Sequence, residues 1–122
     1  MEQDVLAGLA GVLLMGGESR RMGRDKGIIA IDGMPLWERH WELLGTVARP
    51  RYRTVPSGQP PGEGILPDPA PSPGPLPGIA AALAAMPGDW LLVLAVDLIG
   101  VDARIVEHLY RERVTGGVVM PR

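Results

Sequence analysis

Residues 13–26 combine an apolar run, adjacent glycines and closely spaced cations, an order that suits phosphate chemistry. Gly16 and Gly17 lack a Cβ, so a nucleotide can approach the backbone at these positions. The cationic side chains that follow are Arg20, Arg21, Arg24 and Lys26. Such cations neutralise phosphate oxygens, and free backbone N–H groups bind the same anions. We therefore predict a polyphosphate-binding loop here, with a solvated basic turn at the end of a strand as the alternative.

Asp97 is a second candidate, because it comes directly after the strongly apolar segment Trp90–Val96. A carboxylate that follows a buried strand reaches the sheet edge at which α/β proteins bind ligands. Mg²⁺ prefers one or two carboxylates together with phosphate oxygens. We therefore predict that Asp97 holds a magnesium–nucleotide complex, with a surface carboxylate that begins a turn as the alternative.

The candidates lie between segments in which strand patterns alternate with helix patterns. The expected strands cover residues 11–15, 28–31, 49–55, 65–66, 90–96 and 118–120, and the expected helices cover 35–47, 79–86 and 103–113. This alternation predicts a three-layer, Rossmann-like α/β fold, with a mostly parallel sheet and helices on both faces. The carboxyl ends of parallel strands share one edge, so Gly16, Gly17 and Asp97 are expected to gather there.

Three local features carry more specific expectations. Alternating arginines and a proline in residues 49–55 predict an edge or frayed strand. Residues 67–78 are rich in proline and predict a stiff, extended loop within the domain, with a disordered linker as the alternative. Asp102 is expected to cap the last helix, whose buried face would comprise Ile105, Val106, Leu109 and Tyr110.

Composition narrows the class of protein. A chain of 122 residues predicts a single domain spanning residues 1–122. Its net charge of −2 argues against a general nucleic-acid or membrane-surface binder, and no apolar run is long enough to cross a membrane. The absence of cysteine excludes disulfides and thiolate metal sites. The N-terminus has no signal-peptide pattern, so we expect a cytoplasmic protein.

The cationic loop resembles the signature of the molybdenum cofactor guanylyltransferases, the molybdopterin-guanine dinucleotide biosynthesis protein A family. That family's pattern is L-A-G-G-x-S-x-R-M-G-x-D-K, and Leu14–Lys26 departs from it only at Met15, where the family has Ala. Pro73–Gly78 is similar to a second family segment, P-G-P-L-x-G. Asp97 stands where the family binds Mg²⁺ in a C-D-x-P sequence, although Leu98 and Ile99 replace the usual residues after it.

This resemblance implies a nucleotidyltransferase that moves GMP from GTP to molybdopterin carrying molybdenum and releases pyrophosphate, with Mg²⁺ as cofactor. It implies catalytic roles for Arg21 and Lys26 and metal binding by Asp97. The nucleotide contacts that it implies are Leu14, Met15, Gly16, Gly17, Lys26, Asp68, Gly78 and Asp97. The partners would be GTP and the molybdenum cofactor, without nucleic acid or membrane, and with a homo-oligomer or cofactor-biosynthesis proteins as further partners.

The resemblance leaves alternatives open. Family members continue beyond the segment that Val118–Met120 resembles, so the domain is expected to be incomplete at its C-terminus. One alternative is a related nucleotidyltransferase that uses another nucleotide or acceptor, such as CTP with molybdopterin. A second is a nucleotide-binding domain without catalysis. A third is an interaction protein that uses its proline-rich segment, which would leave the cationic loop unexplained.

Overall fold

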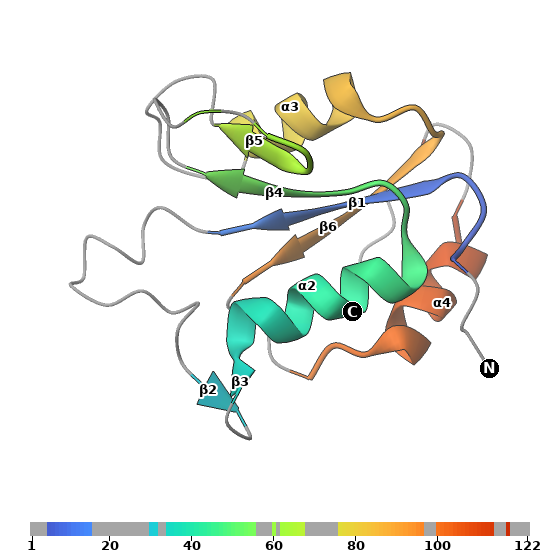
Figure 1. Ribbon diagram of the computed structural model, residues 1–122. Helices are drawn as coiled ribbons and strands as arrows, with labels where there is room; N and C mark the ends of the chain where they lie inside the picture. The colour runs from blue at the N-terminus through green and yellow to red at the C-terminus, as the bar shows by residue number, and fades with distance from the viewer. Residues whose placement is uncertain are drawn as a thin grey trace.

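The computed structural model describes residues 5–15, 30–31, 34–55, 60, 62–67, 76–96, 100–113 and 117. Its centre is a four-stranded sheet of order β5-β4-β1-β6, in which every neighbouring pair is parallel (Figure 1). The strands are β1 (Leu9–Leu14), β4 (Arg51–Val55), β5 (Ile65–Pro67) and β6 (Trp90–Ala95). A separate antiparallel pair joins β2 (Ala30–Ile31) to β3 (Met34–Pro35).

Helices cover both faces of the sheet. They are α2 (Leu36–Val47), α3 (Leu76–Ala85) and α4 (Ala103–Arg111). Figure 1 shows α2 and α4 on one face and α3 on the other. This arrangement confirms the expected three-layer α/β fold. No helix in the described part of the chain has the length and apolar character needed to cross a membrane.

The central strand β1 owes its burial to side chains on both of its faces. Ala10 and Val12 are fully buried on the face towards α3, where Ala82 is also fully buried. On the other face, Gly11 lets α2 approach, because a Cβ at this position would lie 2.5 Å from Cδ2 of Leu44. The helices therefore pack against β1 from both faces of the sheet.

Helix α2 runs antiparallel to β1, so its first turn lies near the carboxyl end of the sheet. Val47 and Ala48, at the end of α2, form a buried cluster with Leu9, which begins β1. Trp37, in the first turn of α2, instead packs against the buried cluster that contains Leu13. This direction decides which residues of α2 can reach a ligand at the carboxyl edge.

The structure corrects three expectations. The arginine-rich strand β4 is not at an edge, because it pairs with β1 on one side and β5 on the other. Helix α3 begins at Leu76, three residues earlier than the alanine pattern indicates, and includes Pro77 in its first turn, where proline is tolerated. Ile105 is 38% exposed, whereas Val106 is 2% exposed, so the buried stripe of α4 is narrower than predicted.

Candidate functional site

The predicted site residues divide into two groups. Leu14, Met15 and Gly78 lie in the part of the chain that the structure describes. The others lie outside the described residues: Gly16, Gly17, Arg21, Lys26, Asp68 and Asp97. The described elements that lead into these segments fix where the site lies.

The first relationship joins β1 and β6. The two strands pair in parallel with Leu14 opposite Ala95, and the Val96 N–H donates to the Leu14 carbonyl at 3.1 Å. The residues that continue the chain are Gly16 after Met15 and Asp97 after Val96. The glycine-rich cationic segment and the candidate metal ligand therefore leave the same sheet edge from adjacent strands. Adjacent strands lie roughly 5 Å apart.

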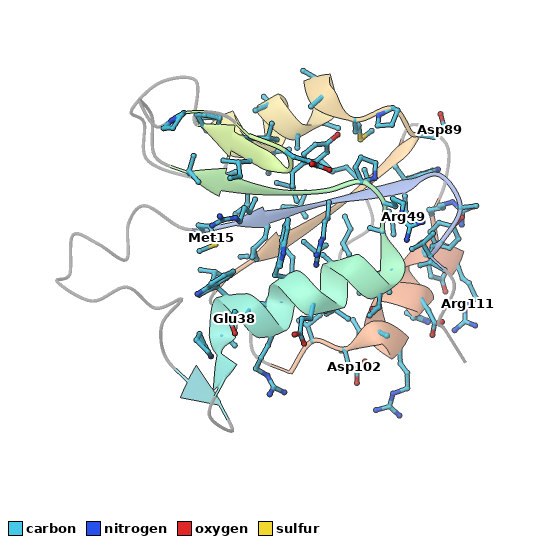
Figure 2. All side chains as sticks on the ribbon, viewed as in Figure 1. Met15, Glu38, Arg49, Asp89, Asp102 and Arg111 are labelled. Atoms are coloured by element: carbon cyan, nitrogen blue, oxygen red, sulfur yellow. The ribbon has the colours of Figure 1, made fainter. Side chains whose placement is uncertain are left out.

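The second relationship fixes Met15 itself. Its backbone N–H donates to Oγ1 of Thr54 at 3.1 Å, and Thr54 is 6% exposed. Figure 2 labels Met15 at the end of β1, with Asp89 at the opposite end of the sheet. Sequence reasoning did not single out Thr54, because this contact depends on the β1–β4 register and leaves no pattern in the sequence. Thr54 thus tethers the point at which the cationic loop begins.

Helix α3 brings Gly78 towards the same edge. The hydroxyl of Tyr52 donates to the carbonyl of Ala85 at 3.3 Å, which places the last turn of α3 beside the early part of β4. The first turn of α3, with the buried Gly78, therefore lies nearer the carboxyl end of the sheet. First-turn N–H groups of a helix have no partner within the helix, and they favour anions. Asp68 follows Pro67 at the end of β5, two strands away from β1.

The carboxylates of the candidate site suit a metal ion that is bound partly by the protein and partly by nucleotide phosphates. They suit a metal site made of protein ligands alone less well. The described residues contain no group of three or more His, Cys, Asp or Glu side chains placed to hold a metal ion. Mg²⁺ needs only one or two carboxylates when phosphate oxygens supply other ligands. Asp97, a carboxylate that comes two residues after β6, fits that requirement by its chemistry.

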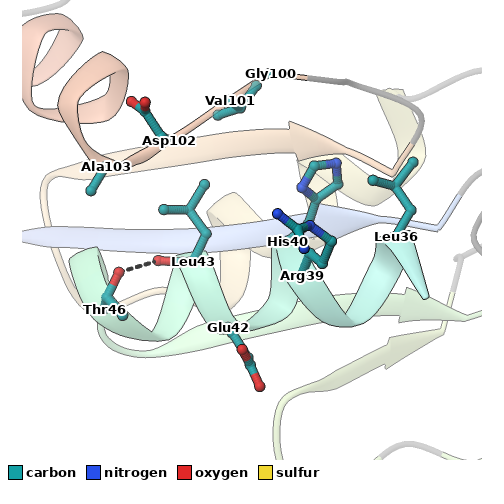
Figure 3. Close-up of a pocket in the computed structure, with 10 residues that line it drawn as sticks. All are labelled: Leu36, Arg39, His40, Glu42, Leu43, Thr46, Gly100, Val101, Asp102 and Ala103. Atoms are coloured by element: carbon teal, nitrogen blue, oxygen red, sulfur yellow. Dashed lines mark hydrogen bonds between the residues drawn. The ribbon is translucent and has the colours of Figure 1, made fainter. Parts of the chain in front are cut away.

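An open groove of about 500 Å³ lies elsewhere, between α2 and the segment that enters α4 (Figure 3). Two of its polar groups already have local partners. Oγ1 of Thr46 donates to the Leu43 carbonyl at 2.8 Å, and Oδ1 of Asp102 accepts from the Ile105 N–H at 3.1 Å. That second contact confirms Asp102 as the N-cap of α4. The hydrogen bond from Ile105, followed by that from Arg104, lowers the pKa of Asp102. The groove contains none of the predicted site residues.

Comparisons with known proteins agree with this geometry. Residues 11–122 match the model of the MobA-like NTP transferase domain family. Three curated relatives carry the name "Probable molybdenum cofactor guanylyltransferase". The Mycobacterium bovis relative is 39% identical over 130 residues, covering 93% of this chain and 61% of the relative. The Mycobacterium marinum relative is 34% identical over 133 residues, covering 98% of this chain and 64% of the relative. The Nostoc sp. relative is 36% identical over 96 residues, covering 74% of this chain and 46% of the relative.

The chain is shorter than the relatives that it matches. The chain spans from about half to just under two thirds of the length of these relatives. The family match nevertheless runs from within β1 to Arg122, and so includes every described element from β2 onwards. It also includes all the segments that leave the carboxyl edge of the sheet. The chain therefore belongs to the family of MobA-like NTP transferase domains.

Proposed function

We propose that this chain binds GTP and transfers its GMP moiety to the terminal phosphate of the molybdenum cofactor. An oxygen of the acceptor phosphate attacks the α-phosphorus of GTP, and the bond from that phosphorus to the bridging oxygen breaks. Pyrophosphate leaves with the bonding electron pair, so the reaction conserves charge and involves no redox step. The names of the relatives, which describe molybdenum cofactor guanylyltransferases, support this choice of substrates.

One structural observation carries the proposal. Strands β1 and β6 are parallel neighbours, with Leu14 opposite Ala95, at the edge from which Gly16 and Asp97 continue. A loop for polyphosphate and a carboxylate for its counter-cation must start close together if they are to bind one nucleotide. The described sheet meets this requirement through its strand order.

The chain's own residues would act by positioning and by charge. The acceptor phosphate is already a nucleophile, so no Ser–His or Cys–His pair is required to generate one. Arg21 and Lys26 would bind phosphate oxygens and stabilise the charge that develops on the departing pyrophosphate. Gly16 and Gly17 would let backbone N–H groups approach the phosphates. Holding donor and acceptor together supplies the remaining catalysis through orientation.

We further propose Mg²⁺ as the cofactor, with Asp97 as its protein ligand. When bound with the nucleotide, Mg²⁺ supplies positive charge that stabilises the phosphate oxygens. Asp97→Asn would keep the size of the side chain and remove its charge. We expect this variant to weaken the dependence of nucleotide binding on magnesium concentration, and an unchanged dependence would contradict the assignment.

Calorimetric titration of Mg-GTP tests the proposal, with Mg-CTP and Mg-ATP as controls. Selective binding of GTP, abolished by Lys26→Ala, is the expected result. Preference for CTP would keep the reaction class and change the nucleotide. Binding without turnover in the presence of acceptor would assign a nucleotide-binding domain instead. Absence of binding for all three nucleotides would overturn the proposed function.

Self-association is a further expectation, based on the side of β6 that has no neighbouring strand among the described residues. Within the described sheet β6 has a neighbour only on the β1 side, and Trp90–Ala95 contains neither a charge nor a proline. Such an edge readily pairs with another strand. We expect light scattering to detect a concentration-dependent oligomer that Val93→Lys disrupts, because Val93 is 36% exposed. A strictly monomeric protein would contradict this expectation.

We place the protein in the cytoplasm, where molybdenum cofactor and GTP would be available to it.

A further inference from the structure

Two arginines of β4 project towards α2, and their surroundings differ. Arg51 is fully engaged with the helix: its Nη1 donates to the Trp41 carbonyl at 2.7 Å, and its guanidinium lies 4.1 Å from the centre of the Trp41 ring. A Cβ at Gly45 would lie 2.7 Å from the same Nη1, so the glycine makes room for this contact. Arg51 therefore holds β4 against α2.

Arg53 makes a longer cation–π contact with α2, and among the described residues no hydrogen bond to the helix accompanies it. Its guanidinium lies 5.7 Å from the centre of the Trp37 ring, and the residue is half-buried. Within the described ranges, no carboxylate pairs with this guanidinium and no oxygen accepts from it. A guanidinium carries five N–H donors, which lie in its plane. The cation–π contact with Trp37 uses none of these donors, so they are available to an anion.

Arg53 lies nearer than Arg51 to the candidate site. Arg53 is opposite Leu13 on the neighbouring strand, and the next residue, Thr54, binds the Met15 N–H. Trp37 lies in the first turn of α2, which is the end of that helix near the carboxyl edge. The Arg53–Trp37 pair is thus closer than the Arg51–Trp41 pair to the point where Gly16 continues the chain.

We infer that Arg53 is a phosphate-binding residue of this site and that Trp37 is the positioning residue that orients it. The inference rests on the proposed function, because it takes its ligand from that reaction. A planar guanidinium can bind two oxygens of one phosphate, which suits either a phosphate of the nucleotide or the terminal phosphate of the acceptor. Arg53 would supply a cation from the sheet, in addition to the proposed loop cations Arg21 and Lys26. It would do so on the side of the site that faces α2.

Calorimetry with inorganic tripolyphosphate tests the inference without relying on turnover, and guanosine provides a phosphate-free control. We expect Arg53→Gln to weaken tripolyphosphate binding about tenfold or more, the loss typical of a charge-assisted bidentate contact. Guanosine binding should not change. If Arg53→Gln affects only the KM of the acceptor, the inference holds with the acceptor phosphate as the ligand.

Matched variants separate binding from folding. Arg51→Gln removes an arginine from the same face of the same strand, so it should lower thermal stability while phosphate affinity stays within about twofold of wild type. Arg53→Lys keeps the charge but loses the planar group, so it should recover part of the affinity even if Arg53→Gln folds poorly. Trp37→Phe should preserve phosphate affinity through its aromatic face, whereas Trp37→Leu should not.

The outcomes distinguish this inference from the function on which it rests. Wild-type affinity for tripolyphosphate and wild-type acceptor KM in both Arg53 variants would overturn the inference, while GTP binding by those variants would leave the proposed function intact. Equal losses in Arg51→Gln and Arg53→Gln would also overturn it, because they would indicate a shared structural role. If the wild-type protein binds neither GTP nor tripolyphosphate, both the inference and the proposed function are overturned.

Discussion

The backbone N–H of Met15 and the hydroxyl of Thr54 meet at 3.1 Å across the boundary between β1 and β4. Met15 is the last described residue before the cationic loop, and Thr54 is buried. The bond satisfies a backbone donor at the point where the β1–β4 pairing ends. Thr54 therefore links the regular sheet to the start of the segment that would bind phosphate.

Thr54→Val should lower the free energy of unfolding by about 1 kcal/mol, because it leaves the partly buried Met15 N–H without its acceptor. The same change should raise the KM for GTP more than it changes kcat, since it loosens the start of the loop. Urea denaturation and steady-state kinetics provide the two measurements. Thr46→Val is the matched control: Thr46 is exposed and binds only its own helix, so its effect should stay within about 0.5 kcal/mol. Equal effects of the two substitutions would argue against a role for the Met15 contact.

Lys26→Ala should lower kcat/KM by roughly a hundredfold, which corresponds to about 3 kcal/mol of lost transition-state stabilisation. Lys26 is the only lysine in the chain, so acylation of amines followed by mass spectrometry reports on this side chain and the N-terminus alone. Mg-GTP should protect Lys26 from acylation, whereas guanosine should not. Arg104→Gln on α4, where the side chain is 89% exposed, should leave turnover unchanged. Wild-type turnover by Lys26→Ala would defeat the assignment.

Gly11→Ala should lower the free energy of unfolding by about 1–3 kcal/mol through overpacking. The new Cβ would lie 2.5 Å from Leu44 Cδ2 and 3.2 Å from Ala48 Cβ, and Leu44 is fully buried. Combining Gly11→Ala with Leu44→Ala should cost less than the sum of the single changes, because the smaller side chain removes the closest contact. Gly62→Ala is the control, since its nearest neighbour, Ile65 Cδ1, would be at 3.5 Å. Additive effects in the double variant would contradict this account.

Asp102 should make a small, pH-dependent contribution to stability. Hydrogen bonds from Ile105 and then Arg104 lower the pKa of its carboxyl in the folded protein. Its ionised form therefore stabilises α4 above the unfolded pKa of about 4, and this stabilisation fades as the pH falls through the lower folded value. Between about pH 7 and about pH 3, the melting temperature should fall less in Asp102→Asn than in wild type. Asp102→Ala should melt lower at every pH in the neutral range, because it loses the cap altogether.

The alternation of strand and helix patterns predicted the layers correctly, and it placed the ends of β1 and β6 at a common edge. It failed for β4, where the alternating arginines indicated an exposed edge. Half-buried Arg51 and Arg53 are accommodated on an inner strand because their guanidinium groups make cation–π contacts with Trp41 and Trp37. Long cationic side chains can bury their stems in this way. Periodicity cannot reveal such a partnership, since the tryptophans lie on another element.

The candidate site was predictable only in part, because some of its contacts also depend on residues that are distant in the sequence. Motif residues such as Gly16 and Lys26 are marked by their types and spacing along the chain. Thr54 and Arg53 acquire their significance from strand register, which brings residue 54 to residue 15. Neither residue type is unusual for a strand. Contacts of this kind emerge only when distant segments are paired.

The order of strands has a consequence for how the chain is made. Of the strands in the described sheet, β1 is synthesised before the others, yet it lies inside the sheet and pairs along its whole length with β6, from Leu9 opposite Trp90 to Leu14 opposite Ala95. Contacts between segments so distant in sequence slow folding. A nascent chain on the ribosome would therefore hold an apolar strand with one side uncovered until β6 emerges. That interval is when chaperones would matter most to the yield of folded protein.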